Sequence, residues 1–232
     1  MKFWTKDRQL TPSWHFAPTS FKLVLEHLTT IAYLSFLPAL LLNAALAMIV
    51  DGQKFATGSR LDQGLGLFAL AALWSLLAQP GFIYFQAKAV QGTAPSTLNA
   101  FKHGLSKFVP LALCALLTGL AVIVGFILFI IPGLIALRAF LLAPFYIVDR
   151  DLGPIAALKQ SAADTKPVSA WVWGTIGVII AFSFMAASLH DIAVIGPALS
   201  LIISSLYVFG PALRYADITN RLSLDQKSAS RL

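Results

Sequence analysis

Residues 108–148 read FVPLALCALLTGLAVIVGFILFIIPGLIALRAFLLAPFYIV and contain one charged side chain, Arg138. As one helix this run would be about 60 Å long at about 1.5 Å per residue, roughly twice the hydrocarbon thickness of a bilayer. The chain is therefore expected to turn back within the run. We expect the turn at Pro132-Gly133, because proline removes a helix hydrogen bond and glycine permits a tight reversal. Two antiparallel membrane helices are the simplest solution.

The rest of the chain is also rich in apolar residues and poor in charged ones. Of its 232 residues, 58% are hydrophobic and 12% are charged, whereas a soluble domain is about 25% charged. We therefore predict an all-α, polytopic membrane helix bundle that forms one integral membrane domain over residues 1–232. The expected spans are residues 30–50, 65–87, 108–131, 134–148, 168–189 and 192–213, with an N-terminal cytoplasmic segment (1–17) and a cytoplasmic tail (218–232).

The distribution of lysine and arginine predicts the orientation of these spans. Most of these residues lie before the first span, between the second and third, between the fourth and fifth, and after the sixth, whereas Lys54 and Arg60 lie on the other side. Because cytoplasmic loops carry an excess of Lys and Arg, this pattern predicts a multi-pass inner-membrane protein with both termini in the cytoplasm. The net charge of +7 then indicates anionic lipid as a partner and no nucleic acid.

Three short amphipathic segments lie on the expected cytoplasmic side. Their apolar residues recur with helical spacing, and we expect each segment to lie in the membrane interface. The segments are Phe21, Val24, Leu25 and Leu28; Leu98, Phe101, Leu105 and Phe108; and Pro154 to Thr165. Since each precedes a pair of spans, the chain is interpreted as three repeated units, each with a short interfacial helix followed by a span out and a span back.

The centre of the chain, from Gly125 to Trp173, carries a series of short motifs. They are Ile131-Pro132-Gly133-Leu134, Leu137-Arg138, Ala143-Pro144, Val148-Asp149, Gly153-Pro154, Ala157-Leu158-Lys159-Gln160-Ser161 and Thr165-Lys166. This series resembles the membrane domain of the glycerophosphoryl diester phosphodiesterase superfamily and of related uncharacterised bacterial integral membrane proteins. Ala162 and Pro167 depart from that pattern. The resemblance implies a membrane architecture, and it implies no phosphodiester hydrolysis, since the family's chemistry belongs to a separate soluble barrel domain.

Arg138 is the first candidate for a functional residue, because a charge within a span is costly. Its guanidinium could bind a lipid phosphate or a substrate anion. The alternatives are that Arg138 reaches the outer headgroups or donates to carbonyl groups freed at Pro132.

The remaining candidates fall into three sets. Contacts with lipid or another anion are expected at Arg138, Lys22, Lys102, Lys107 and Lys159. The intramembrane amides Asn43, Gln79 and Gln86 are expected to bond across helices or to line a polar path. Helix breaks are expected at Pro80, Gly81, Pro132 and Gly133.

The sequence contains no motif for nucleotide binding or metal-dependent hydrolysis, and its one cysteine, Cys114, lies in an apolar run. We therefore expect no metal, no cofactor and no enzyme activity. The predicted function is to organise lipid or a membrane partner complex, with a membrane-protein partner or a homo-oligomer as the associated species. The alternative is a small transporter or lipid-translocating protein whose polar path includes Arg138.

Overall fold

The computed structural model describes residues 10–55, 58–190, 200, 202–203 and 205–229, and these residues form helices and no strand. Five helical stretches are long and apolar enough to cross a membrane. They are Leu28–Ile49, Asp62–Val90, Phe108–Leu128, Ile130–Arg150 and Ser169–Ser188. The all-helical, multi-span architecture is thus as predicted. Within the sixth expected span, 192–213, residues 192–199, 201 and 204 lie outside the described residues, so this span is not tested as a whole.

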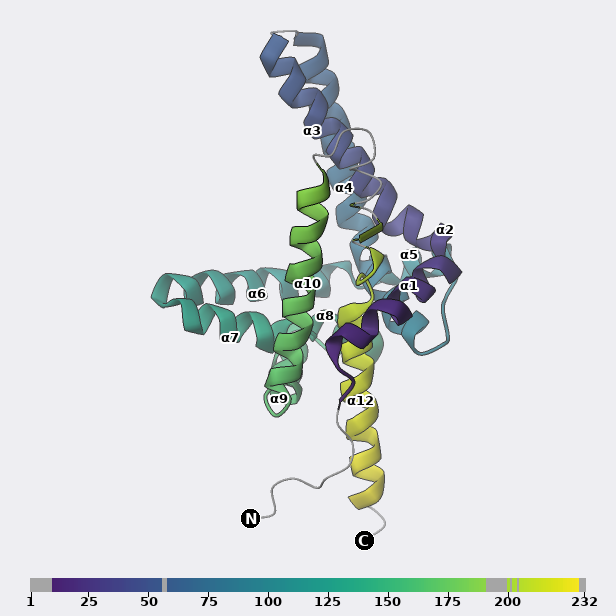
Figure 1. Cartoon of the computed structure of the whole chain (residues 1–232), viewed down its shortest axis with the longest axis vertical. Coiled ribbons are helices and arrows are strands. Elements are labelled where there is room, and N and C mark those ends of the chain that lie inside the picture. The colour runs from purple at the N-terminus through teal and green to yellow at the C-terminus, as the bar shows by residue number, and fades with distance from the viewer. Residues whose placement is uncertain (1–9, 56–57, 191–199, 201, 204, 230–232) are drawn as a thin grey trace.

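The first part of the chain leads into a long hairpin. Its elements are η1 (Ser13–His15), α1 (Phe16–Glu26), α2 (Leu28–Ile31), η2 (Ala32–Phe36), α3 (Leu37–Phe55) and α4 (Gly58–Val90). The turn η2 is a π-helix directly before Pro38, which has no N–H for the carbonyl of Leu34. In Figure 1, α3 and α4 run side by side away from the rest of the molecule.

The expected helix break at Pro80-Gly81 is not a helix end, because α4 continues through Pro80 to Val90. This pair is instead where α5 (Thr97–Ser106) crosses α4. A Cβ added to Gly104 would lie 2.1 Å from the Gly81 nitrogen, so the two backbones touch. Pro80 and Gly81 are both buried there. The proline and the two glycines therefore permit a close helix crossing.

The turn in the central apolar run falls three residues earlier than predicted. Helix α6 (Phe108–Leu128) ends before Phe129, which is extended at φ −164° and ψ 156°, and α7 (Ile130–Phe140) begins directly after it. Pro132 then lies in the first turn of α7, where a missing N–H breaks no helix bond. A Cβ on Gly125 would lie 2.7 Å from the Gly133 Cα atom. Gly133 thus permits close packing of α6 on α7 and does not form the turn.

The predicted fourth span, 134–148, is divided between two helices. Helix α7 stops at Phe140, and α8 (Ala143–Arg150) begins beside Pro144, which suits the first turn of a helix. Two further helices follow, α9 (Pro154–Thr165) and α10 (Ser169–His190). The three amphipathic segments predicted from the sequence correspond to α1, α5 and α9.

The last described helix, α12 (Gly210–Ala229), begins within the predicted sixth span and continues through most of the predicted tail. The proposed boundaries at 213 and 218 are therefore not helix ends. Pro211 lies in its first turn, as at other helix starts.

The buried side chains form two adjoining clusters where the helices meet. One is built around α8 and includes Leu142, Tyr146 and Tyr215; the other includes Phe85 of α4 and Phe209. We call this region, with the short helices α1, α5 and α9 around it, the base. In Figure 1 the α3–α4 hairpin and the α6–α7 hairpin leave the base in different directions.

Candidate functional site

Arg214, near the start of α12, is the largest fully buried side chain, with 0% of its surface exposed. Its Nη2 atom donates to the Thr11 carbonyl and to Ser13 Oγ, both at 2.9 Å. Its Nε atom donates to Thr175 Oγ1 at 3.0 Å, and its Nη1 atom donates to Asp217 at 3.1 Å. One guanidinium therefore joins the N-terminal segment, α10 and α12.

Aromatic rings and a carboxylate complete the surroundings of Arg214. The guanidinium carbon lies 4.7 Å from the ring centre of Phe16 and 5.9 Å from that of Trp171, within the range of cation–π attraction. Asp217 also accepts a bond from the Thr11 backbone N–H at 2.9 Å. Burial lowers the pKa of Arg214, and the charge of Asp217 acts in the opposite direction. The buried charge is thus compensated at every donor nitrogen.

A second polar cluster is centred on Asp149, near the end of α8. Its carboxylate accepts from Lys88 Nζ at 2.8 Å, from Gln91 at 3.2 Å and from the Tyr215 hydroxyl at 2.8 Å. Burial and the bond to Asp149 raise the pKa of Tyr215 above its usual range. Since Tyr215 follows Arg214 in α12, both clusters hold the same helix, and α4, α8, α10 and α12 are joined by polar contacts.

Two further contacts fix the ends of α8 and α9. Lys107, between α5 and α6, forms an ion pair with Asp151, the left-handed residue at φ 57° that follows α8. Asp164 of α9 accepts from the hydroxyl of Tyr146 and, at 2.9 Å, from Gln160. The carboxylates of the base are thus occupied by cations and hydroxyls that hold helices together. Among the described residues, no group of three His, Cys, Asp or Glu residues could hold a metal ion.

The lysines predicted to contact lipid differ in their exposure to solvent. Lys22, Lys102 and Lys159 are exposed on α1, α5 and α9, respectively, and Lys22 also lies 3.7 Å from Glu26. Lys107 differs from these three, because it is half-buried and its ammonium is paired with Asp151.

Arg138 is half-buried on α7. Its Nε atom is buried and makes no hydrogen bond within the described part of the chain. One donor of Arg138 thus has no acceptor among the described residues.

The three intramembrane amides also differ from one another. Gln86 of α4 is buried and donates to the Val208 carbonyl at 2.7 Å, a bond between distant segments of the kind expected. Asn43 is exposed and donates to the Ala39 carbonyl in its own helix at 2.8 Å. Gln79 is exposed on α4. Of the three amides, only Gln86 is buried.

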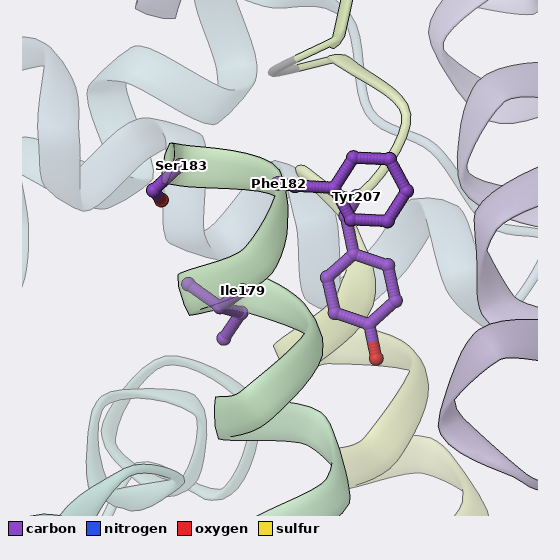
Figure 2. A pocket seen from close by; sticks show the side chains of 4 residues that line it. All are labelled: Ile179, Phe182, Ser183 and Tyr207. Carbon is purple, nitrogen blue, oxygen red and sulfur yellow. The ribbon is translucent and has the colours of Figure 1, made fainter. Parts of the chain in front are cut away.

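A small pocket lies between α10 and the segment that precedes α12, lined by Ile179, Phe182, Ser183 and Tyr207. Figure 2 shows the Tyr207 ring beside that of Phe182, with its hydroxyl directed away from that ring. The two rings are stacked with centres 5.8 Å apart. Arg138 does not line this pocket.

Arg214 was missed in the sequence because it is one of several cations near the C-terminus. The relevant signal is local: Gly210-Pro211 starts a helix, and Ala212, Tyr215 and Ile218 recur on one face of it. Its acceptors Thr11, Ser13 and Thr175 are too far away in the chain for any local pattern to reveal them.

The fold and this base define an all-helical chain with several helices of membrane-spanning length and a polar base. Comparisons with known protein families, with curated proteins and with solved structures gave no match. The resemblance to the phosphodiesterase-associated membrane domain therefore stays a prediction.

Proposed function

We propose that the chain is a non-enzymatic, multi-pass protein of the bacterial inner membrane that organises anionic lipid, or a membrane partner complex, at the cytoplasmic surface. In this proposal both termini lie in the cytoplasm. The helices belong to the three repeated units that the sequence predicts. The base holds the lysine-bearing helices α1, α5 and α9 in place, and the apolar hairpins extend into the bilayer.

One observation carries this proposal: each of the three short helices exposes a lysine and an apolar side chain one helical turn apart. The exposed apolar partners are Leu25 on α1 at 60%, Leu98 on α5 at 61% and Ile155 on α9 at 62%. They are three or four residues from Lys22, Lys102 and Lys159, so each pair shares a helix face. This is how an interfacial helix buries apolar side chains among acyl chains and keeps its charge at the headgroups.

The expected energetics favour anionic headgroups. A lysine near an anionic membrane surface contributes about 1 kcal/mol. The apolar partners add their own burial and do not distinguish between headgroups. Selectivity for anionic lipid should therefore depend on the lysines, and attachment of the helices to the interface should depend on both groups.

The test is retention of lipid by purified protein. A triple variant combines Lys22→Gln, Lys102→Gln and Lys159→Gln. The protein is extracted from mixed vesicles, and native mass spectrometry counts the bound phosphatidylglycerol and phosphatidylcholine molecules. The preference for phosphatidylglycerol is expected to fall at least about tenfold, given about 1 kcal/mol per lysine. Lys54→Gln, in α3 at the far end of the hairpin, is the matched control and is expected to keep the preference. An unchanged preference in the triple variant would contradict the proposal.

A second candidate function, movement of lipid or a small anion along a path through Arg138, is favoured by the unpaired, buried Nε atom of this residue. It predicts that protein in vesicles accelerates the exchange of labelled lipid between leaflets and that Arg138→Gln removes this acceleration. The lipid-organising proposal predicts exchange no faster than in protein-free vesicles.

A further inference from the structure

The α6–α7 hairpin differs from an ordinary pair of membrane spans at its tip. From Phe108 to Leu137 the sequence contains no Asp, Glu, Lys, Arg or His. The residues at the tip are apolar and highly exposed, with Ile127 at 77%, Phe129 at 75%, Ile130 at 68% and Ile131 at 70%. A turn that emerges into water on the far side of a membrane would place these four side chains in water, at a cost of roughly 1.5–3 kcal/mol for each fully exposed large side chain.

The backbone at this tip is also suited to lipid. Hydrocarbon offers no partners for backbone N–H and C=O groups, so they must be satisfied within the protein. The connection is the single residue Phe129, and its N–H donates to the Gly125 carbonyl at 3.0 Å. Pro132 removes one donor from the first turn of α7, where N–H groups lack helical acceptors. The bond at Phe129 and the proline at position 132 thus reduce the number of backbone groups at the tip that need a partner.

The two helices of the hairpin pack directly on each other near the tip. Gly125 and Gly133 bring the backbones into direct contact, an arrangement that favours helix association in lipid. The outward side chains of α6, including Leu116, Leu120 and Ile123, are more than half exposed. An apolar surface without charged side chains is suited to contact with lipid acyl chains.

The direction of the hairpin agrees with this assignment. Figure 1 shows α6 and α7 running crosswise to α10 and away from the α3–α4 hairpin. If α10 and α3–α4 cross the bilayer, α6–α7 lies inclined within it and its tip does not reach the opposite surface. The tip of α3–α4 is different in sequence, since it carries Asp51, Lys54, Arg60 and Asp62.

We propose that the α6–α7 hairpin ends inside the hydrocarbon layer, with acyl chains covering Phe129, Ile130 and Ile131. The second repeated unit then contains a re-entrant hairpin in place of a span out and a span back. Because this hairpin enters and leaves on the same side, the orientation of both termini is unchanged. This inference deepens the proposed lipid function and rests on it for the presence of a bilayer around the protein. The inference depends on the apolar tip of the hairpin. It depends neither on Lys22, Lys102 and Lys159 nor on anionic headgroups.

The test measures the depth of the tip in phosphatidylcholine vesicles. Phe129→Cys and Gln53→Cys are made separately with Cys114→Ala, labelled with bimane and reconstituted. Bimane at Phe129 is expected to be quenched several-fold more by nitroxide deep in the acyl chain than by nitroxide on the headgroup, and little by aqueous iodide. Bimane at Gln53, the control at the polar tip, is expected to show the reverse order.

Two outcomes would overturn this proposal. Quenching at Phe129 by iodide or headgroup nitroxide to the extent seen at Gln53 would show that the tip crosses the membrane. Absence of quenching by every lipid nitroxide would show that protein, such as a second copy of the chain, covers the tip. Ile131→Cys repeats the measurement at a second exposed position in case Phe129→Cys disturbs the turn. Phosphatidylcholine alone is used, so failure of the lysine-based proposal leaves this result interpretable.

Discussion

Different interactions stabilise the base and the projecting hairpins. In the base, Arg214 and Asp149 are buried or half-buried and are surrounded by hydrogen-bond partners from distant parts of the chain. Toward the tip of the α6–α7 hairpin, the closest contact is between the backbones of its two helices, and the outer surface is apolar. The base should therefore depend on individual polar side chains, whereas the hairpin should depend on close backbone packing and on the solvent around it.

The largest expected effect is at Arg214. Arg214→Leu removes the charge that joins Thr11, Ser13, Thr175 and Asp217, and loss of one partner from a buried ion pair costs about 3–5 kcal/mol. We expect about 3 kcal/mol here, because Asp217 keeps its bond from Thr11 and some contact with water. Thermal unfolding in detergent, followed by tryptophan fluorescence, measures the change.

The control for this change is Arg150→Leu, since Arg150 is exposed at the end of α8. It is expected to shift the unfolding temperature much less. Equal shifts for the two variants would mean that the Arg214 cluster does not hold the base together.

Next in size is the crossing of α4 and α5. Gly104→Ala places a Cβ 2.1 Å from the Gly81 nitrogen, and backbone atoms cannot move aside as a flexible side chain does. Overpacking of this kind costs about 1–3 kcal/mol. Gly119→Ala in α6, where a Cβ meets nothing within 4 Å, is expected to be neutral or slightly stabilising. The two unfolding temperatures, measured in the same detergent, should therefore move apart.

A smaller effect is expected at Asp149. Asp149→Asn keeps the shape of the side chain but removes the charge that pairs with Lys88 and accepts from Tyr215. The loss should be about 1.5 kcal/mol, at the lower end of the range for hydrogen bonds to a charged group, because asparagine keeps one acceptor oxygen. Hydrogen exchange at the C-terminal end of α4 and in α8 should rise, while exchange in α6 stays as in the unchanged protein. A rise of equal size in α6 would show that the two regions are not separate.

The smallest effect is expected at the ion pair between Lys107 and the exposed carboxylate of Asp151. Hydrogen bonding to Lys107, together with its positive charge, lowers the pKa of Asp151. A lowered carboxyl pKa contributes stability above the unfolded value of about 3.9 and loses it as the pH falls through the folded value. The small difference in unfolding temperature between the protein and Asp151→Asn should therefore disappear below about pH 3.9. It should also shrink in high salt. A difference that persists in acid would point to another role for Asp151.

The sequence predicts the parts of this fold that depend on neighbouring residues. Apolar runs place the long helices, and helical spacing places α1, α5 and α9. The position of the central turn was wrong by three residues, because Pro132 is tolerated in the first turn of a helix and so marks the start of α7. The break between α7 and α8 was also missed, although Pro144 marks it.

The candidate site could be predicted only in part. The exposed lysines were found because exposure of a lysine beside an apolar stripe is a local property. The role of Lys107 was not found, since Asp151 lies beyond three intervening helices. Arg214 illustrates the general difficulty: a buried arginine is tolerated only where acceptors converge on it, and such convergence is a property of the folded chain.

The central claim is that α1, α5 and α9 lie together on one membrane surface. Three single-cysteine variants are made in the Cys114→Ala background: Leu25→Cys, Leu98→Cys and Ile155→Cys. Each variant is spin-labelled and reconstituted in vesicles that contain phosphatidylglycerol. The depth of each label is then measured by its relaxation with oxygen and with a water-soluble nickel complex. We expect all three labels at one shallow depth, just below the phosphates. Labels fully accessible to the nickel complex, or labels at three different depths, would contradict the claim.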